Sequence, residues 1–235
     1  MRVIDREQAK LVAGFRSTTR ANTRLLALTR AGFLNRFFAG TILGGRKGIY
    51  TFAPKAAAIV DGPPTACPRK RNETLAGVLF LEHQMLVNSI YTTVKCRPIP
   101  LPGISLQLWR AFRQRLSSTV PIMPDGYFEL EAPTGVRAMF LEVDLGTERL
   151  SIWRRKVRAY LHLAISGQFL KLFQQSQFRV LVVAMSDRRL ATIRQTVARL
   201  TDKIFWFSTF ELINREGFWS PIWLRPQGDQ RQSLL

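Results

Sequence analysis

Apolar and polar residues at the start of the chain recur with the period of an α-helix in two consecutive segments. The first, residues 5–15, ends at a Gly-Phe pair that is followed by a short polar turn. The second, residues 19–34, begins beside Thr18 and Thr19, whose hydroxyl groups are typical helix N-caps. Two helices joined by a tight turn predict a helix-turn-helix pair. The apolar stripe of the second helix consists of Ala21, Leu25, Leu28 and Gly32.

The period then changes to the two-residue alternation of β-strands. Residues 41–54 alternate around a glycine-rich tip, which predicts a β-hairpin. Helix pair and hairpin together predict an N-terminal winged helix-turn-helix module over residues 1–64. A winged helix normally has a further helix ahead of the pair, and few residues precede Asp5. We therefore expect a module that is either trimmed or completed by a partner.

Residues 61–74 are rich in proline and basic residues and predict a linker or an exposed loop. Beyond it, a second domain over residues 65–235 alternates strand and helix patterns. Their order predicts an α/β domain with a mixed sheet flanked by helices. The predicted helices span 73–94, 146–164 and 187–200, and the predicted strands span 125–132, 136–145, 178–186 and 203–210. Residues 100–116 predict a loop with one short helix, and residues 217–226 a final extended segment.

The net charge of the chain indicates a class of function, which the pattern of apolar residues does not. The formal net charge is +19 and the sequence pI is about 11.3. Such a positive field favours a polyanionic partner, most often nucleic acid. An acidic membrane surface is the rival interpretation, but the chain has no long apolar run and no basic amphipathic anchor. The charged start lacks a signal peptide pattern, and two cysteines without a zinc spacing favour a cytoplasmic protein.

The basic residues are concentrated at the N-terminus. No Asp or Glu occurs between Glu7 and Asp61, whereas nine basic residues do. Opposite the apolar stripe, the second predicted helix carries an Arg/Thr face, and the predicted hairpin carries two basic residues near its tip. We expect these side chains to contact double-stranded DNA, at phosphates or guanine edges. They are Arg20, Thr23, Arg24, Arg30, Arg46 and Lys47.

Acidic residues are concentrated further on. Asp125 opens one predicted strand, and Glu142 and Asp144 end its hairpin partner, on the same face because they are two residues apart. Three carboxylates at one end of a sheet repel each other unless a cation lies among them, and oxygen ligands suit Mg²⁺ or Mn²⁺. We expect a metal site at Asp125, Glu142 and Asp144. Lys156, on the following helix, can assist an attacking water if that helix packs accordingly.

Other candidates have simpler explanations. His83 is expected to be structural, and Glu82 is a weaker candidate metal ligand. Glu129 and Glu131 are expected on the solvent face, and Glu148 in the first turn of the helix capped by Thr147, where the helix dipole favours it. The tryptophans can stack on bases, but most are expected in the core or at interfaces. They are Trp109, Trp153, Trp206, Trp219 and Trp223.

The pattern Pro124-Asp125, then Glu142-x-Asp144, then a helical Lys156 resembles the PD-(D/E)xK nuclease-like core. In that superfamily an Asp and a Glu hold the metal, and a Lys two residues after the Glu assists the attacking water. Here Asp144 stands at the position of that Lys. The resemblance implies either that Lys156 replaces it or that the domain is an inactive relative.

A closer resemblance covers most of the chain. The segments LEHQMLVNSIY, PDGYFELE, FLEVDLGTE, RRKVRAYL, FRVLVVAMSDRR, FWFSTFELI and WLRP are similar to the replication-relaxation family of actinobacterial and plasmid-borne proteins. The resemblance implies a winged helix followed by a nuclease-like α/β domain, with a role in plasmid replication or mobilisation.

Three functions remain open. The first is a DNA-binding protein with an inactive nuclease-like domain. The second is a Mg²⁺-dependent DNA endonuclease that nicks or cuts DNA, with Asp125, Glu142 and Lys156 as catalytic residues. The third is an accessory subunit of a larger protein–nucleic acid complex. The Asp at position 144 favours the first and third, whereas the carboxylates together with Lys156 support the second.

Overall fold

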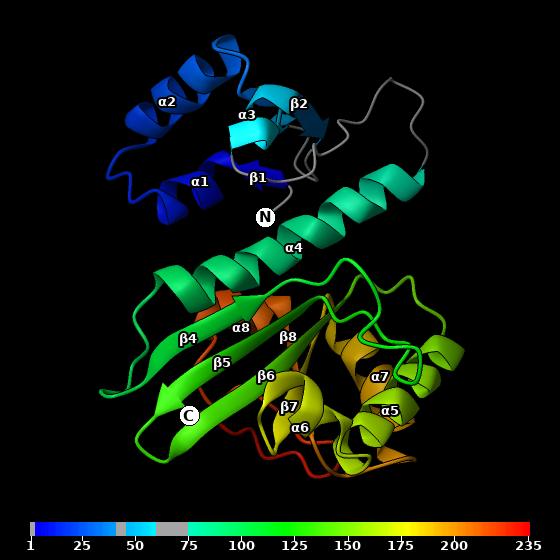
Figure 1. Cartoon of the computed structure of the whole chain (residues 1–235). Coiled ribbons are helices and arrows are strands. Elements are labelled where there is room, and N and C mark those ends of the chain that lie inside the picture. The colour runs from blue at the N-terminus through cyan, green and yellow to red at the C-terminus, as the bar shows by residue number, and fades with distance from the viewer. Residues whose placement is uncertain (1–2, 41–45, 60–74) are drawn as a thin grey trace. The chain divides into compact units, whose positions relative to one another are not determined.

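The computed structural model describes residues 3–40, 46–59 and 75–235. The chain divides into two compact units, Met1–Arg97 and Pro98–Leu235 (Figure 1). The first unit is a small antiparallel sheet with helices, and the second is a five-stranded mixed sheet with helices. A mixed α/β architecture, as the sequence predicts, is confirmed.

The first unit contains the predicted helix pair and the predicted hairpin. The three strands pair antiparallel in the order β1-β3-β2, with Val3 opposite Thr51 and Leu34 opposite Phe52. The elements are β1 (Val3–Asp5), α1 (Arg6–Val12), α2 (Thr18–Arg30), β2 (Leu34–Gly40), β3 (Arg46–Phe52), α3 (Pro54–Ile59) and α4 (Leu75–Cys96). The first hairpin strand, β2, therefore lies ahead of the predicted range 41–54, whereas β3 lies within it. Residues 41–45 lie outside the described part of the chain.

Side-chain caps define where the two paired helices begin. Asp5 caps α1 in a capping box, in which its carboxylate accepts from the Gln8 backbone N–H and the Gln8 side chain accepts from the Asp5 backbone N–H. Ser17 caps α2, one residue before the predicted Thr18 or Thr19, with its Oγ accepting from the Arg20 N–H. Ser17, Thr18 and Thr19 each carry a hydroxyl group that can cap a helix. Ser17 is the cap because its backbone is extended and the helix begins at the next residue.

Helix α4 packs on α1 and β1, which changes the predicted domain boundary. The buried amide of Gln8 donates to the Met85 carbonyl at 3.0 Å and to the Ser89 hydroxyl at 3.1 Å. The buried amide of Asn88 donates to the Val3 carbonyl. Buried amides need such partners, so α4 is part of the first unit. The compact units divide between residues 97 and 98, whereas the sequence places the boundary between residues 64 and 65.

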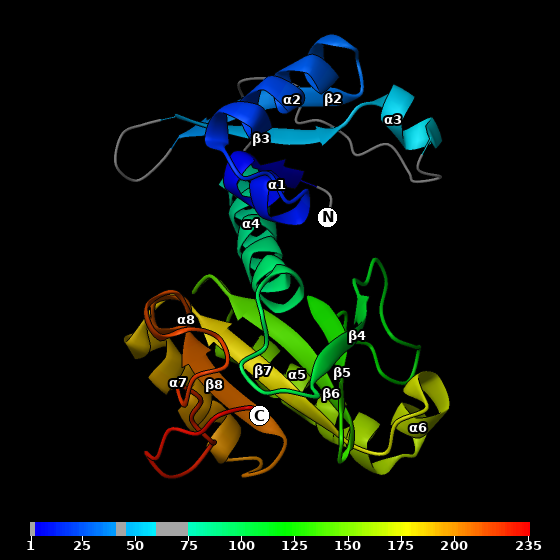
Figure 2. The ribbon, with the colours of Figure 1, turned by 90° about the vertical axis from the view of Figure 1, so that its left-hand side faces the viewer.

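The second unit is built on one sheet of strand order β4-β5-β6-β7-β8 (Figure 2). Strands β4, β5 and β6 pair antiparallel, while β6, β7 and β8 pair parallel through helical connections. The elements are β4 (Ser105–Arg110), β5 (Gly126–Ala132), β6 (Gly135–Asp144), α5 (Leu150–Ile165), α6 (Gln168–Phe173), β7 (Phe178–Ala184), α7 (Asp187–Ala198), β8 (Phe205–Thr209) and α8 (Phe210–Glu216).

Four segments of this unit differ from the sequence-based expectation. Residues 105–110 form edge strand β4, not a short helix, because Trp109 stacks on Phe128 of β5 at 5.4 Å between ring centroids. Helices α6 and α8 were not expected, since each is only six or seven residues long. Helix α5 begins at Leu150 with Arg149 as N-cap, so Thr147 is not the cap and Glu148 precedes the helix.

The main core lies between the sheet and helices α5, α6 and α7. Alternate residues of the strands face these helices, so Phe140 of β6 contacts Tyr160 of α5 and Phe173 of α6. Trp153 and Trp223 are fully buried, as expected for core tryptophans. Trp206 and Trp219 are also buried, and Trp109 is half-buried. Among the described residues, no helix is both long and apolar enough to cross a membrane.

Candidate functional site

The first candidate site is the outer face of α2. Ala21 and Leu25 of the predicted apolar stripe are buried, and Leu28 is half-buried, whereas Gly32 lies beyond the end of the helix. The opposite side is exposed over its whole length. It presents Arg20, Thr23, Arg24 and Arg30. Within the described part of the chain, no carboxylate lies within ion-pair distance of these three arginines.

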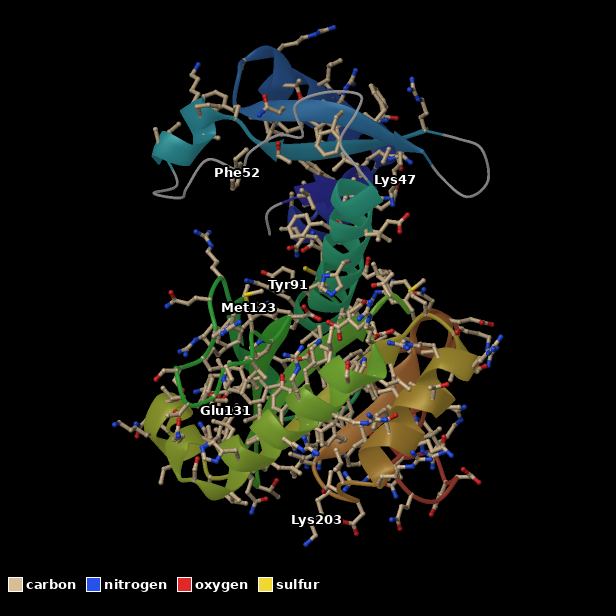
Figure 3. All side chains as sticks on the ribbon, turned by 90° about the vertical axis from the view of Figure 1, so that its right-hand side faces the viewer. Lys47, Phe52, Tyr91, Met123, Glu131 and Lys203 are labelled. Carbon is tan, nitrogen blue, oxygen red and sulfur yellow. The ribbon has the colours of Figure 1, made fainter. Side chains whose placement is uncertain are left out.

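The two basic residues of the hairpin differ from each other. Arg46 and Lys47 are both exposed at the start of β3. Lys47 is labelled in Figure 3. Lys47, however, forms an ion pair with the buried carboxylate of Asp5, which also caps α1. Lys47 therefore compensates the charge of Asp5, and this contact joins the hairpin to the start of α1. Lys47, which the sequence assigns to DNA contact, thus already has an ion-pair partner within the protein.

The second candidate site is a buried cluster around Glu142 of β6. The Glu142 side chain is 1% exposed. Its Oε2 lies 2.8 Å from the Nζ of Lys156, and its Oε1 accepts a hydrogen bond from the Tyr160 hydroxyl at 2.6 Å. Lys156 and Tyr160 are four residues apart on α5, and therefore on one side of that helix. Lys156 thus reaches the carboxylates, as the packing of α5 requires, and both oxygens of Glu142 have protein partners.

Glu148 and Asp125 complete this cluster. Lys156 Nζ also lies 3.0 Å from Oε1 and 2.9 Å from Oε2 of Glu148. Glu148 is consequently a partner of Lys156 rather than a first-turn helix charge, which sequence reasoning missed because it placed the helix start at Thr147. Asp125 accepts from the Val143 N–H at 2.7 Å through Oδ2, and it is close enough to act electrostatically on Glu142 and Lys156.

Burial and charge set the protonation behaviour of the cluster. Burial raises the pKa of Glu142, and the positive charge of Lys156 opposes that effect. Burial disfavours the charged form of Lys156, but the carboxylates of Glu142 and Glu148 outweigh it and raise the pKa of Lys156 well above its ordinary value. Burial, followed by Glu142, raises the pKa of Tyr160. Lys156 therefore stays protonated over the whole physiological range.

Asp144 belongs to a separate arrangement. Its carboxylate accepts from Nε and Nη2 of Arg189 at 2.7 and 2.9 Å, from the Trp153 indole at 2.9 Å and from the Gly146 N–H at 2.6 Å. Burial alone would raise the pKa of Asp144, but these hydrogen bonds, with that of Arg189 first, hold it below its usual value. Asp144 shares the Glu142 face of β6, as predicted, but it is a hydrogen-bonded ion-pair partner that locks α5 and α7 to the sheet.

A metal ion at the expected site would need free oxygen donors. Among the described residues, no group of three or more His, Cys, Asp or Glu side chains is arranged to hold a metal ion. The oxygens of Glu142 are taken by Lys156 and Tyr160, and those of Asp144 by Arg189, Trp153 and Gly146. As folded, the three carboxylates do not fit an Mg²⁺ or Mn²⁺ ligand set.

The remaining acidic candidates lie outside this cluster. Glu129 was expected on the solvent face, yet it is buried and accepts a hydrogen bond from the Tyr127 hydroxyl. Two residues apart on β5, the two side chains share a face, which explains the contact. Glu131 is exposed, as Figure 3 shows. Glu82 and His83 lie on α4, in the first unit.

Comparisons with known proteins identify the family of this chain. Residues 2–174 match the replication-relaxation family, which is about three quarters of the chain. The matched range ends before β7, so the resemblance assigned to FRVLVVAMSDRR, FWFSTFELI and WLRP lies outside it. No curated protein matches.

One solved structure, EndoMS in apo form, is 11% identical over 68% of this chain and 61% of the EndoMS chain. Its TM-score of 0.21 is too low to support an argument about fold or activity. The family match stands on its own, because it covers the first unit and the second unit through α6. The chain belongs to the replication-relaxation family.

Proposed function

We propose that this chain is a DNA-binding protein of the plasmid replication or mobilisation type, which contacts double-stranded DNA through the exposed face of α2. The observation that carries the proposal is the side chains of that face: three exposed arginines and a threonine, with no carboxylate near them in the described part of the chain. Guanidinium groups bind phosphate oxygens and guanine edges, and a threonine hydroxyl binds either type of group.

The topology of the first unit supports a winged helix as the DNA-binding fold. Strand β1, the pair α1 and α2, and the hairpin β2–β3 follow one another in the order of such modules. The usual additional helix is α4, which packs on α1 and β1 although it follows the hairpin in sequence. In this proposal α2 is the recognition helix, and Arg46 near the hairpin end contacts the DNA backbone.

A binding titration tests this proposal. The affinity of the full chain for a short fluorescent duplex is measured by anisotropy, beside the double variant Arg20→Ala/Arg24→Ala. Loss of two charge-assisted contacts is expected to weaken binding by about two orders of magnitude. Arg6→Ala is the matched control, since Arg6 is an exposed arginine of the same unit that is already paired with Glu7 at 2.8 Å.

The control separates specific contacts from net charge. The loss of affinity in Arg6→Ala is compared with half of the loss, in free energy, that the double variant shows. If the two are equal, α2 is not the contact surface. If the double variant binds duplex like the unmodified chain, the proposal fails. The third function considered above, an accessory subunit of a larger complex, uses the same surface, so this titration does not depend on the choice between them.

A Mg²⁺-dependent endonuclease is the second candidate, because Asp125, Glu142 and Lys156 act on one another electrostatically at one end of the sheet. The contacts of Glu142 count against it: a cation can bind there only after Lys156 and Tyr160 release both oxygens. We therefore propose that the second unit is a nuclease-like domain whose carboxylates are neutralised internally.

Cleavage of supercoiled plasmid tests this second proposal. The purified chain is incubated with Mg²⁺ or Mn²⁺, beside Asp125→Ala/Glu142→Ala. We expect no nicking or linearisation by either protein. Cleavage by the unmodified chain that disappears in the double variant would establish the endonuclease instead, and Lys156→Ala would then test the role of the lysine.

A further inference from the structure

Two arginines converge on one peptide oxygen on the sheet face opposite α5 and α7. Arg137 of β6 and Arg179 of β7 both donate through Nη1 to the carbonyl oxygen of Leu234, at 3.2 and 2.7 Å. Strand register places them on the same face, because Met139, two residues after Arg137, is opposite Arg179. Glu142 and Asp144 differ from Arg137 by odd numbers of residues and face the other way. This arginine pair is thus separate from the carboxylate cluster.

A third arginine and a tryptophan extend the pair. The guanidinium carbons of Arg179 and Arg225 each lie 4.7 Å from the ring centroid of Trp206, on β8. Arg225 also donates to the Asp202 carbonyl at 3.1 Å. Trp206 is 7% exposed, and its indole N–H has no acceptor among the described residues. The ring holds both guanidinium groups by cation–π contact and limits where they can move.

No ion pair among the described residues balances the positive charge of this cluster, and Asp202 acts on Arg225 only as a more distant charge. Within the part of the chain described, no carboxylate lies within 4.0 Å of Arg137, Arg179 or Arg225. Their acceptors there are neutral carbonyls. Burial, then the charges of Arg137 and Arg225, lowers the pKa of Arg179, which reflects the same crowding. All three side chains are half-buried, so each is still reached by solvent.

We propose that Arg137, Arg179 and Arg225 form a binding site for a phosphate group, in which Trp206 contacts Arg179 and Arg225. Each guanidinium has five N–H donors and uses one for the carbonyls named above, so several donors remain for an anion. The planar fork of arginine matches the oxygens of a phosphate, and partial burial strengthens the interaction relative to an arginine in water. A phosphate would bring negative charge into direct contact with the guanidinium groups, which Asp202 does not do.

The phosphate can belong to a small molecule or to the backbone of a nucleic acid, and both present the same oxygens. The site does not rest on the proposed role of α2, because the two sets of arginines lie in different compact units. Variants of one set leave the other intact, so their effects can be measured separately.

Titration of the full chain with inorganic phosphate, followed by isothermal calorimetry at low ionic strength, tests the site. We expect saturable binding that Arg179→Gln and Arg225→Gln each weaken by about tenfold, the loss of one charge-assisted hydrogen-bonding group. Arg199→Gln is the matched control, because Arg199 is exposed on the end of α7 and its loss removes the same charge. Arg20→Ala/Arg24→Ala should bind phosphate like the unmodified chain.

Folding defects are separated from binding defects by the choice of variants. Arg179→Gln removes a bond to Leu234 and can loosen the C-terminal segment, whereas Arg225→Gln leaves both bonds to Leu234 in place. Near-ultraviolet circular dichroism checks that each variant retains its tertiary packing. Reduced phosphate affinity in a folded Arg225→Gln therefore supports the site independently.

A duplex titration identifies the source of the phosphate. If Arg179→Gln and Arg225→Gln weaken both inorganic phosphate and duplex binding, the ligand is the nucleic acid backbone; if only phosphate binding falls, it is a small phosphorylated molecule. Absence of saturable phosphate binding overturns the proposal. It is equally overturned if Arg199→Gln weakens phosphate binding as much as the cluster variants do, because net charge would then explain the effect.

Discussion

The Nζ of Lys156 lies 2.8 Å from Oε2 of Glu142, across the interface between α5 and β6. The carboxylate is 1% exposed and the lysine side chain 20% exposed, so the pair is largely removed from water. A buried carboxylate is costly unless a cation and hydrogen bonds compensate it. Here the cation is a side chain of the protein itself, which makes Lys156 a structural partner of Glu142 whatever else the cluster does.

Replacing Lys156 with methionine is expected to destabilise the second unit. The change leaves Glu142 buried with the Tyr160 hydroxyl as its remaining hydrogen-bond partner, and breaking a buried pair in this way costs about 3–5 kcal/mol. Urea denaturation measures the free energy of unfolding. Arg155→Met, at the exposed neighbouring position, should stay within about 0.5 kcal/mol of the unmodified chain.

The double variant Glu142→Gln/Lys156→Met checks that the cost comes from the unpaired charge. Its destabilisation should be smaller than the sum of the two single variants, because neither charge remains to be compensated. Strict additivity would mean that the two side chains do not interact, contrary to the 2.8 Å contact.

Asp144 is expected to make the stability of the fold depend on pH in the acidic range. Its folded-state pKa lies below the ordinary value of 3.8, because hydrogen bonds led by that of Arg189 outweigh burial. A depressed carboxyl pKa stabilises the fold above the unfolded-state pKa, and this stabilisation is lost as the pH falls through the folded-state pKa. The difference in unfolding free energy between the unmodified chain and Asp144→Asn should therefore be largest near neutral pH and narrow below about pH 4.

Urea unfolding at several pH values measures that difference, with Asp187→Asn as the exposed control. A difference that stays constant down to about pH 3 would show that Asp144 has no depressed pKa in the folded state.

Even a conservative substitution of Arg189 is expected to destabilise the fold. Its guanidinium binds both oxygens of Asp144 and also donates to the Glu148 carbonyl, a geometry that a lysine ammonium cannot reproduce. Arg189→Lys should lower the unfolding free energy by about 1–3 kcal/mol, while Arg188→Lys, at an exposed position, should be close to neutral. Equal stability of the two variants would show that the paired hydrogen bonds are not needed.

Helix α4 is expected to be necessary for folding of the first unit. A fragment of residues 1–64 lacks the partners of the Gln8 and Asn88–Val3 contacts, whereas a fragment of residues 1–97 keeps them. We expect the longer fragment to give dispersed amide NMR signals and the shorter one to give those of an unfolded chain. A folded shorter fragment would restore the boundary near residue 64.

Salt dependence reports how many phosphates α2 contacts. The logarithm of the binding constant falls linearly with the logarithm of the salt concentration. Each phosphate contact that is lost should make this slope less steep by about 0.9. If Arg20 and Arg24 each bind one phosphate, the slope measured for the double alanine variant should be less steep by about 1.8 than that of the unmodified chain. An unchanged slope with weaker binding would assign these arginines to base edges instead.

Much of the architecture follows from local patterns. The period of apolar residues is sufficient to predict α2, β5, β6, α5, β7, α7 and β8, because each is long enough for its buried face to be read from spacing alone. Helix α7 begins at Asp187, as predicted, and Ser186 is its N-cap. Edge strand β4 and the short helices α6 and α8 were not predicted, because pairing and packing with distant residues stabilise them.

The sequence by itself determined which charges this protein carries: a long N-terminal stretch without acids, a face of arginines on α2, and carboxylates on one face of β6. Only the tertiary structure decided the partners of these charges. Lys156 meets Glu142, Arg189 meets Asp144, and Arg137 meets Arg179 because helices and strands distant in sequence pack together. Charge composition is a local property, whereas charge compensation depends on distances that exist only in the folded chain.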